Sequence, residues 1–321
     1  MIDIGKIEDA ARRLSGIAIR TPLLQSNVLD RIASGTVLLK PECFQQTGSF
    51  KIRGAYNLLG QLSADQAKRG VVAFSSGNHA QGAALAGKLL GIHTAIVMPG
   101  DAPAAKLENT RRLGGEVITY DRHSGDRERI ARDLAAERGA YVVPSYDHPD
   151  IIAGQGTVGL EIAEQSRSLG FRPDQVLISC GGGGLTSGSA IALKARLPDV
   201  AVYPVEPEEF DDTARSLEQG VRVANPHTAA SICDALQAEM PGEITFDINR
   251  KLVSGVLLVS DDEVREAMRF AFRSLKLVVE PGGAVALAAV LAGKIETAGK
   301  TTAVVLSGGN VDVEMFSSIQ E

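Results

Sequence analysis

Four consecutive glycines, Gly181 to Gly184, form the motif with the clearest chemical potential in this chain. They follow an apolar run at 175–179, which predicts a strand, and they precede a helix-like stretch at 186–196. Glycine leaves backbone N–H groups unshielded, and the N-terminus of a helix attracts anions. The motif therefore predicts a phosphate cradle, although it is neither a Walker A sequence nor the dinucleotide-binding fingerprint. The alternative is a flexible turn.

A lysine between two apolar residues is the candidate nucleophile. Lys51 lies between Phe50 and Ile52 in the stretch GSFKIRGAYN at 48–57. Burial lowers the pKa of a lysine amine and makes the amine nucleophilic. Combined with a phosphate cradle, such an amine indicates a phosphate-bearing aldehyde held as a Schiff base. Most lysines are solvated, so the alternative is an ordinary surface charge.

Two further polar motifs come directly after apolar runs. The stretch SSGNHAQG at 75–82 offers hydroxyl, amide and N–H groups that suit a carboxylate. Its alternative is a helix cap by Ser75 or Ser76 without a ligand. The stretch SGGN at 307–310 follows another apolar run, so both motifs lie where a predicted strand ends.

The elements that must position these motifs alternate along the chain. Short apolar runs predict strands, and the amphipathic stretches between them predict helices. This alternation predicts βαβ units and two open α/β sheets. In such sheets ligands bind beyond the carboxyl ends of the strands, which is where most of the motifs lie. The predicted strands are 71–74, 93–99, 116–120, 175–179, 201–205, 256–260 and 301–307.

The composition describes a chain that can bury a large core. It has 321 residues, of which 44% are hydrophobic, and about 150 residues per domain suggests two domains. The net charge of −6 makes nucleic acid and anionic membranes unsuitable partners. Three cysteines without a C-x-x-C pair exclude a disulfide scaffold and a cysteine-based zinc site. We see neither a signal peptide nor a membrane-spanning run, so we expect a soluble, cytoplasmic protein.

In this order and spacing, the motifs resemble those of the fold-type II pyridoxal-phosphate enzymes, most of all the serine/threonine dehydratase, serine racemase and 3-hydroxyaspartate dehydratase branch. The resemblance covers essentially the whole chain and rests on GSFKIRGA, SSGNHAQG, IAGQGT, GGGGL, VEP and SGGNVD. It implies an α/β fold like that of tryptophan synthase β, with two open, mostly parallel sheets flanked by helices. It also implies a large cofactor-binding domain at 1–68 and 148–321, a small mobile domain at 69–147, and a homodimer.

The resemblance implies pyridoxal 5′-phosphate as the cofactor, held by Lys51 as a Schiff base. The backbone of the four glycines and of Leu185 would surround the phosphate, Asn78 would meet the phenolic oxygen, and Ser307 the pyridine nitrogen. A neutral serine at this nitrogen makes a weaker electron sink than an aspartate, which favours loss of a β-substituent over transamination. The implied cofactor-binding residues are Phe50, Lys51, Asn78, Gly181, Gly182, Gly183, Gly184, Leu185, Glu280, Ser307 and Gly308.

The implied reaction is α,β-elimination from a β-hydroxy amino acid, a small-molecule substrate. Lys51 would remove the Cα proton as general base, the β-hydroxyl group would leave, and hydrolysis would give a 2-oxo acid and ammonia. The leading prediction is therefore an L-threonine or L-serine ammonia-lyase with Lys51 and Ser76 as catalytic residues. The implied substrate-binding residues are Ser75, Ser76, Gly77, Asn78, His79, Arg127 and Gln155.

Ser76 keeps two related activities open. Threonine dehydratases of the family usually carry alanine here, whereas serine racemases and 3-hydroxyaspartate dehydratases carry serine. A serine racemase with side elimination and a 3-hydroxyaspartate dehydratase are therefore alternatives. Two stretches, YDRHSGDRE and YDHPDIIAGQGT, also resemble the hydroxyaspartate enzymes, so Arg122, Arg127 and His148 could neutralise a second substrate carboxylate. The alternative is that these three are surface charges beside a cleft.

A divalent cation site is also implied by the resemblance. Its ligands fall on Glu206, the backbone carbonyl of Phe210 and Asp212, within VEPEEFDD at 205–212. Oxygen ligands of this kind suit Mg²⁺, Ca²⁺ or Mn²⁺ in a structural or activating site. The alternative is an acidic helix start without a metal.

The chain departs from the family's usual sequence at two places near the cofactor. Cys-Asp-Ala at 233–235 replaces the usual Ala-Asp-Gly, and Glu-Pro-Gly-Gly at 280–283 replaces Glu-Pro-Thr/Ser-Ala/Gly. These changes leave the cofactor prediction intact and the identity of the β-hydroxy amino acid open. A non-catalytic binding protein and a β-replacement enzyme of the same fold are more distant alternatives, disfavoured by Lys51 and by the metal-site segment respectively.

Overall fold

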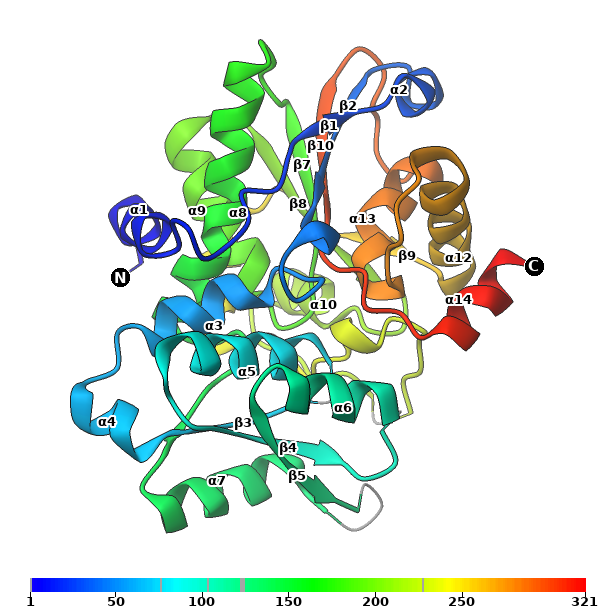
Figure 1. Ribbon diagram of the computed structural model, residues 1–321. Coiled ribbons are helices and arrows are strands. Elements are labelled where there is room, and N and C mark those ends of the chain that lie inside the picture. Colours follow the sequence, from blue (N-terminus) through cyan, green and yellow to red (C-terminus); the bar gives the residue numbers. More distant parts are fainter. Residues whose placement is uncertain (1, 76, 103, 122–124, 227) are drawn as a thin grey trace.

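The computed structural model describes residues 2–75, 77–102, 104–121, 125–226 and 228–321. Within these residues the chain forms two open sheets, each covered by helices on both faces (Figure 1). The larger sheet has the strand order β1-β2-β10-β7-β8-β9, and β1 alone of these runs antiparallel to its neighbour. Its strands are β1 (Leu24–Gln25), β2 (Thr36–Pro41), β10 (Thr301–Leu306), β7 (Gln175–Ser179), β8 (Ala201–Pro207) and β9 (Leu257–Val259).

The smaller sheet has the order β5-β4-β3-β6, and all its strands are parallel. Its strands are β5 (Gly115–Tyr120), β4 (Thr94–Pro99), β3 (Val71–Phe74) and β6 (Tyr141–Val142). We call residues 71–142, which contain this sheet, the smaller lobe. The prediction of an α/β fold with two open, mostly parallel sheets is confirmed, while the exact domain bounds and the mobility of the smaller domain stay predictions.

The helices connect and cover these strands. Two short 3-10 helices, η1 (Glu42–Phe44) and η2 (Asp234–Leu236), and a π-helical turn, η3 (Ala271–Leu275), complete the structure. The α-helices are α1 (Ile4–Arg13), α2 (Asn27–Ala33), α3 (Lys51–Leu59), α4 (Ala64–Arg69), α5 (Asn78–Leu90), α6 (Ala104–Arg112), α7 (Arg127–Arg138), α8 (Pro149–Ser168), α9 (Gly184–Arg196), α10 (Asp212–Gln219), α11 (Glu243–Leu252), α12 (Asp261–Phe270), α13 (Pro281–Leu291) and α14 (Val313–Gln320).

Helices α8 and α9 pack with their backbones in close approach. A Cβ atom placed on Gly156 would lie 2.7 Å from the carbonyl oxygen of Gly188, and one on Gly159 would lie 2.6 Å from the Cα of Ser189. Side chains at these positions would hold the two helices apart. The glycines therefore let α8 bring its inner face, including Gln155, to the first turn of α9.

A buried ion cluster fixes the start of α3. The Arg53 side chain is 1% exposed and contacts Glu42 at 2.8 Å and Glu161 of α8 at 2.7 Å. Lys40 of β2 is fully buried, and its Nζ lies 2.6 Å from Glu161. Buried charges are stable only when they are paired, so this cluster constrains α3, α8 and β2 relative to one another.

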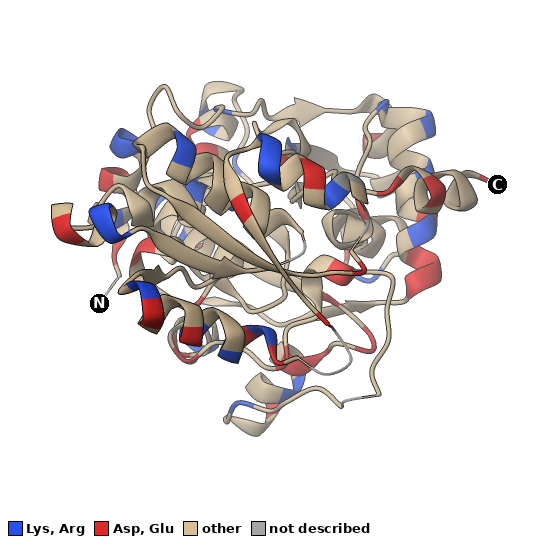
Figure 2. Ribbon diagram, turned by 60° about the horizontal axis from the view of Figure 1, so that its bottom comes forward, with Lys and Arg blue, Asp and Glu red and all other residues tan. Residues whose placement is uncertain are grey.

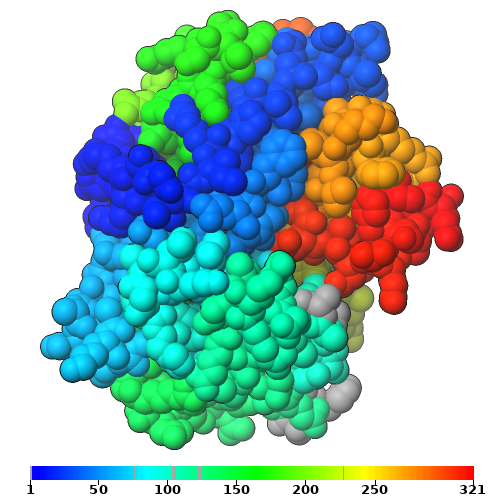
Figure 3. All heavy atoms as spheres, in the orientation of Figure 1, coloured from blue at the N-terminus to red at the C-terminus, as the bar shows by residue number. Residues whose placement is uncertain are grey.

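The surface carries charges of both signs. Figure 2 shows Lys and Arg interspersed with Asp and Glu along the surface helices, as the near balance of 33 basic and 39 acidic residues requires. In Figure 3 the smaller lobe, coloured cyan to green, lies directly against the blue and red segments above it. Among the described residues, no helix is long and apolar enough to cross a membrane.

Candidate active site

Lys51 is the first residue of α3, and its amine faces the carbonyl oxygen of Ser145 at 3.1 Å. The amine also lies 5.1 Å from the centre of the Phe50 ring. Burial lowers its pKa to about 8, although the nearby Glu280 carboxyl opposes this shift. Near neutral pH such an amine is unprotonated in a far larger fraction of molecules than a solvated lysine, as a nucleophile or base requires.

Asn78 and Glu280 link the smaller lobe to the rest of the molecule close to this lysine. Asn78 begins α5 and Glu280 precedes α13, and both side chains are buried. The Asn78 amide donates from Nδ2 to Glu280 Oε1 at 2.6 Å. Burial raises the pKa of Glu280 to about 8, and the nearby Asp234 adds to this shift. Glu280 is therefore largely protonated at neutral pH.

The loop after β10 is tied to the start of α3. Ser49 and Gly308 form an antiparallel bridge, and the Phe50 N–H donates to the Ser307 carbonyl at 3.2 Å. A Cβ atom on Gly308 would overlap Glu280 Oε1. Ser307 and Gly308 thus lie beside Phe50 and Glu280, so the structure brings these predicted cofactor residues together.

The four-glycine loop lies between β7 and α9, as predicted. Gly183 has a φ of 93°, which favours glycine, and Gly184 begins the helix. A Cβ atom on Gly182 would overlap the Tyr146 ring, and one on Gly184 would lie 2.5 Å from Gln155 Oε1. The loop therefore presents backbone at a helix N-terminus, which is the arrangement that binds anionic groups.

Gln155 and Leu185 complete the surroundings of this loop. Leu185 is the second residue of α9 and is buried. Gln155 is 1% exposed, and among the described residues its Oε1 has no hydrogen-bond partner. A buried polar atom without a partner costs free energy, so this oxygen indicates a place for a ligand.

The start of α5 provides backbone groups for a carboxylate. Ser75 follows β3, and its Oγ accepts a hydrogen bond from the Gly77 N–H at 3.2 Å. The His79 ring donates from Nε2 to the Val143 carbonyl at 3.1 Å, and burial and then Lys51 lower its pKa to about 3. The His79 ring is therefore neutral and engaged in the fold. Its backbone N–H remains in the first turn, where N–H groups lack intrahelical partners.

The predicted counter-charges for a second carboxylate differ in their surroundings. Arg127 begins α7 and is exposed. His148 accepts at Nδ1 from a backbone N–H of α8, and its Nε2 lies 3.3 Å from the Tyr141 hydroxyl. Burial lowers the His148 pKa, so this ring is uncharged at neutral pH and caps α8. Ser76 and Arg122 lie outside the described residues.

Comparisons with known proteins identify the family. The family described as "Pyridoxal-phosphate dependent enzyme" matches residues 14–308. The chain belongs to the pyridoxal-phosphate dependent enzymes. An L-threo-3-hydroxyaspartate ammonia-lyase of Pseudomonas sp. is 47% identical over 310 residues, which cover 97% of this chain and 96% of that protein.

Solved structures place this pyridoxal-phosphate dependent enzyme within one branch of the family. Maize serine racemase matches with a TM-score of 0.93 and 37% identity, covering 99% of this chain and 96% of that one. A threonine deaminase from T.th. matches with a TM-score of 0.91 and 42% identity, covering 97% of this chain and 99% of that one. The enzyme is a fold-type II, β-eliminating member of the dehydratase and racemase branch, as the motifs predict.

The residues at this site fit pyridoxal phosphate. The glycine loop leaves no room for side chains and presents its backbone at a helix start, which suits a phosphate. Lys51 supplies a desolvated amine for the aldehyde. Asn78, through Asn310, and Ser307, through Phe50, are both tied to the segment that leads into α3, where they can contact a ring attached to Lys51.

The predicted cation ligands of the enzyme form a buried acidic pair. Glu206 lies in β8 and Asp212 begins α10, and both are fully buried. Glu206 accepts from the backbone N–H groups of Thr213 and Ala214 at 3.0 Å each, while Asp212 Oδ2 has no partner among the described residues. Burial raises the pKa of both carboxyls, and proximity to Asp212 raises that of Glu206 further.

This pair fits a cation, with Phe210 lying between its members in the sequence. A positive ion would relieve the burial of two carboxyls and would give the free Asp212 oxygen a partner. In the part of the chain that the structure describes, no three His, Cys, Asp or Glu side chains gather as a metal site. A cation would therefore depend on two carboxylates and the carbonyl, and the metal stays a prediction.

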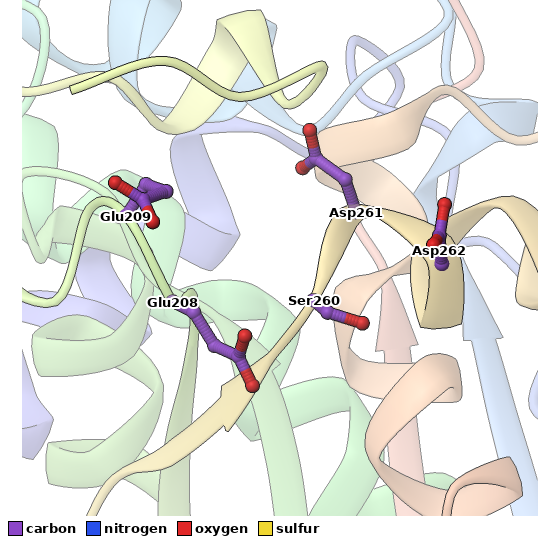
Figure 4. A pocket seen from close by; sticks show the side chains of 5 residues that line it. All are labelled: Glu208, Glu209, Ser260, Asp261 and Asp262. Atoms are coloured by element: carbon purple, nitrogen blue, oxygen red, sulfur yellow. The ribbon is translucent and has the colours of Figure 1, made fainter.

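A separate surface hollow of about 270 Å³ lies next to this segment (Figure 4). Its walls come from the turn after β8 and from the start of α12. Four carboxylates and one hydroxyl make it unsuitable for an anionic cofactor or substrate. The residues that line it are Glu208, Glu209, Ser260, Asp261 and Asp262.

The two departures from the family's usual sequence meet in space. A Cβ atom on Gly282 would lie 3.1 Å from the Cβ of Ala235 and 3.2 Å from Leu236 Cγ. The methyl group at 235 therefore occupies space that a side chain at 282 would need. The paired changes leave Glu280, which precedes Gly282 on the same turn, in contact with Asn78.

Sequence reasoning does not single out three residues that the structure places around the site. Tyr146 packs against the glycine loop, and Asn310 contacts Asn78. Lys106 of α6 lies 3.5 Å from Asp234 and 3.3 Å from Asp312, so it bridges the smaller lobe to the rest of the molecule. Tyr146 begins the motif YDHPDIIAGQGT and Asn310 ends the motif SGGN, so their positions in the sequence could have indicated a role. Lys106 lies in no such motif.

Proposed function

We propose that this enzyme catalyses α,β-elimination from L-threo-3-hydroxyaspartate, releasing ammonia and a 2-oxo dicarboxylic acid. The observation that carries elimination is the Lys51 amine, whose pKa falls to about 8 beside the Asn78–Glu280 pair. The 47% identical lyase of Pseudomonas sp. supports this substrate. The motifs by themselves favour threonine or serine as substrate, with 3-hydroxyaspartate as an alternative, and the similarity to this lyase favours the alternative.

Pyridoxal 5′-phosphate, when bound, supplies an electron sink for the negative charge that develops at Cα. We assign the linkage to Lys51, the phosphate contacts to the four-glycine loop and Leu185, and the ring contacts to Phe50, Asn78 and Ser307. Backbone N–H groups at the start of α5 bind the α-carboxylate together with Ser75 and Gln155. These assignments are supported by the burial and the packing of the site.

The chain's own residues then move the protons. The unprotonated Lys51 amine removes the Cα proton, which its lowered pKa allows at neutral pH. The Cβ–O bond breaks, and the hydroxyl group leaves as water after taking up one proton, which balances the proton that Lys51 removes from Cα. The enamine that is released takes up water and yields the 2-oxo acid and ammonia. Replacing Lys51 by Ala is expected to abolish lysine-linked cofactor and turnover together; normal turnover would refute the assignment.

Recognition of a second substrate carboxylate is assigned to Arg127. It lies at the start of α7, on the smaller lobe that also carries Ser75 and His79. Among the predicted counter-charges His148 is uncharged and engaged as a cap, which leaves Arg127 as the described cation for this role. A charged hydrogen bond of this kind is worth about 1.5–3 kcal/mol.

The test compares kcat/KM for L-threo-3-hydroxyaspartate, L-serine and L-threonine. Arg127→Met is expected to lower the value for hydroxyaspartate by about 10- to 100-fold and to leave serine within about twofold. Arg129→Met is the matched control, since Arg129 is exposed on the same helix. Equal losses for all three substrates would contradict the role of Arg127, and a preference for threonine in the parent enzyme would contradict the proposed substrate.

Racemisation is a second candidate because of Ser76 in the SSGNH sequence. A hydroxyl at this position would exchange the Cα proton on the face opposite Lys51. Measuring the enantiomer of the unreacted amino acid during turnover tests this. Inversion that disappears in Ser76→Ala would support it, and unreacted substrate of one hand throughout would exclude it.

The cation is proposed to be Mg²⁺, or Ca²⁺ or Mn²⁺, bound by Glu206, Asp212 and the carbonyl of Phe210. The unpartnered Asp212 oxygen and the mutual proximity of the two carboxyls support this. This cation would stabilise the connection between β8 and α10 and would not contact substrate.

A further inference from the structure

A chain of hydrogen bonds runs from the start of α3 to Glu280. Asn310 donates from Nδ2 both to the Thr47 carbonyl at 2.7 Å and to Asn78 Oδ1 at 2.7 Å. Asn78 in turn donates from Nδ2 to Glu280 Oε1 at 2.6 Å. The four residues belong to four separate segments that meet at the candidate site.

The donors and acceptors in this series of hydrogen bonds have a fixed order. A side-chain amide can present either its oxygen or its NH₂ group to a neighbour, so its partners decide the orientation. The Thr47 carbonyl can only accept, and it therefore holds the NH₂ group of Asn310. The second hydrogen of that group reaches Asn78, which must offer its oxygen there. Nδ2 of Asn78 is consequently turned toward Glu280.

Packing holds the Asn310 amide in this place. Gly48 has a φ of 69°, and a Cβ atom at this position would overlap Asn310 Oδ1. The Gly309 N–H donates to the Gly48 carbonyl at 2.8 Å, which joins the two loops next to the amide. The amide therefore sits between a backbone acceptor and Asn78, in space that the missing side chain of Gly48 leaves free.

We propose that Asn310 is a positioning residue that keeps the N–H side of the Asn78 amide, and not its oxygen, facing Glu280 and the cofactor ring. The inference rests on the proposed cofactor site, in which Asn78 meets the phenolic oxygen of the ring. A donor stabilises an anionic oxygen, whereas an amide oxygen in the same place repels it. Asn310 thus controls cofactor binding without touching the cofactor.

The decisive variant is Asn310→Asp, which keeps the shape of the side chain and removes its donors. It leaves the Thr47 carbonyl without a donor and attracts the NH₂ group of Asn78, so the Asn78 oxygen turns toward the ring. We expect the Kd of the apoenzyme for pyridoxal phosphate to rise about 30-fold in Asn310→Asp and about threefold in Asn310→Ala. Titration of the apoenzyme followed by absorbance measures this.

Which of the two variants has the higher Kd for pyridoxal phosphate shows whether Asn310 orients Asn78 or only fills space. If Asn310 only fills space, Asn310→Ala weakens binding more than Asn310→Asp, because it removes more atoms. That order, or an unchanged Kd in Asn310→Asp, would overturn the proposal. The absorbance of the bound cofactor gives an independent signature: Asn310→Asp should shift intensity from the band with an anionic ring oxygen to the band with a protonated one.

A double-mutant cycle keeps the test valid if Asn310→Asp does not fold. In an Asn78→Ala background nothing remains to be oriented, so Asn310→Ala should change the Kd by less than about twofold. An undiminished effect of Asn310→Ala in that background would contradict the proposal. Failure of the cofactor site itself is recognised separately, because the parent enzyme would then bind pyridoxal phosphate equally with and without Lys51→Ala.

Discussion

The amine of Lys51 differs from a surface lysine in what surrounds it. Phe50 and the Ser145 carbonyl enclose it, and the nearby Glu280 carboxyl is itself largely protonated because of burial. Because the Glu280 carboxyl is charged in only a fraction of molecules, it opposes the lowering of the Lys51 pKa only in part. The nucleophilicity of the Lys51 amine therefore results from its burial.

Capture of pyridoxal phosphate by the apoenzyme should follow the protonation of Lys51. The unprotonated amine attacks the aldehyde, so the rate is expected to rise with pH around a midpoint of about 8, and not near the ordinary lysine value of 10.5. Stopped-flow absorbance measures the rate. In Glu280→Gln the midpoint should fall further, since the Glu280 carboxyl raises the Lys51 pKa. A midpoint near the ordinary lysine value would contradict the argument.

Some features of this site follow from residue type alone and others do not. Four glycines after an apolar run predict the loop at 181–184, and Lys51 between apolar residues predicts a buried amine; the structure has both. The orientation of Asn78 depends on the carbonyl of Thr47, and the neutral ring of His79 on that of Val143. Backbone atoms of distant segments carry no signal in a local sequence pattern.

At the scale of the elements, periodicity finds most strands of both sheets, including the edge strands β5 and β9, but it misses the inner strand β2 and the two-residue strands β1 and β6. The apolar run at 175–179 coincides with β7, whereas β2 at 36–41 is not among the predicted strands. Lys40 interrupts its apolar pattern, and this lysine is buried because Glu161 of α8 pairs with it. Because its partner Glu161 is distant in the sequence, Lys40 has the pattern of a surface residue, and the sequence therefore does not predict β2.

The ion cluster around Arg53 should be worth far more than a surface pair. Arg53→Ala leaves the buried Glu42 charge without its partner and leaves Glu161 paired with Lys40 alone, so it is expected to lower the free energy of unfolding by about 3–5 kcal/mol. Arg20→Ala is the control, because the Arg20 pair with Glu164 of the same helix is exposed and should contribute about 1 kcal/mol or less. Urea denaturation measures both; similar losses would refute the distinction.

The connection between β8 and α10 should respond to divalent cations. Saturating Mg²⁺ is expected to raise Tm by about 2–5 °C, and a chelator should reverse this. Asp212→Asn should abolish the response, because it removes the charge from the unpartnered oxygen. Glu208→Gln, in the neighbouring acidic hollow, should leave the response intact. A response unchanged by Asp212→Asn would place the cation elsewhere.

At the scale of the whole molecule, the candidate site lies where the smaller lobe meets the rest of the molecule. Asn78 reaches across to Glu280, and Lys106 reaches across to Asp234 and Asp312. Except for Gln155, the substrate contacts are assigned to the smaller lobe, and most cofactor contacts are assigned to the larger part. Closure of the smaller lobe over substrate would therefore complete the site and exclude water.

Locking the two parts together tests this closure. A short bismaleimide joining Lys106→Cys to Asp234→Cys, in a Cys43→Ser background, should lower turnover at least about tenfold while the cofactor stays bound. The uncrosslinked double variant is the control, and the remaining cysteines, Cys180 and Cys233, are buried. Full turnover after crosslinking would show that the lobes need not move.

The chain enters and leaves the smaller lobe through neighbouring strands. Val71 of β3 is paired with Tyr141 of β6, so the two ends of this segment lie side by side. Two neighbouring junctions allow a segment to be exchanged as a cassette without straining the remainder. Arg127, Ser75 and the start of α5, which are assigned to substrate recognition, lie inside the cassette, whereas Lys51, Gln155 and the glycine loop lie outside it. Recombination at these junctions could therefore transfer a substrate preference from one relative to another, while Lys51 and the glycine loop stay unchanged.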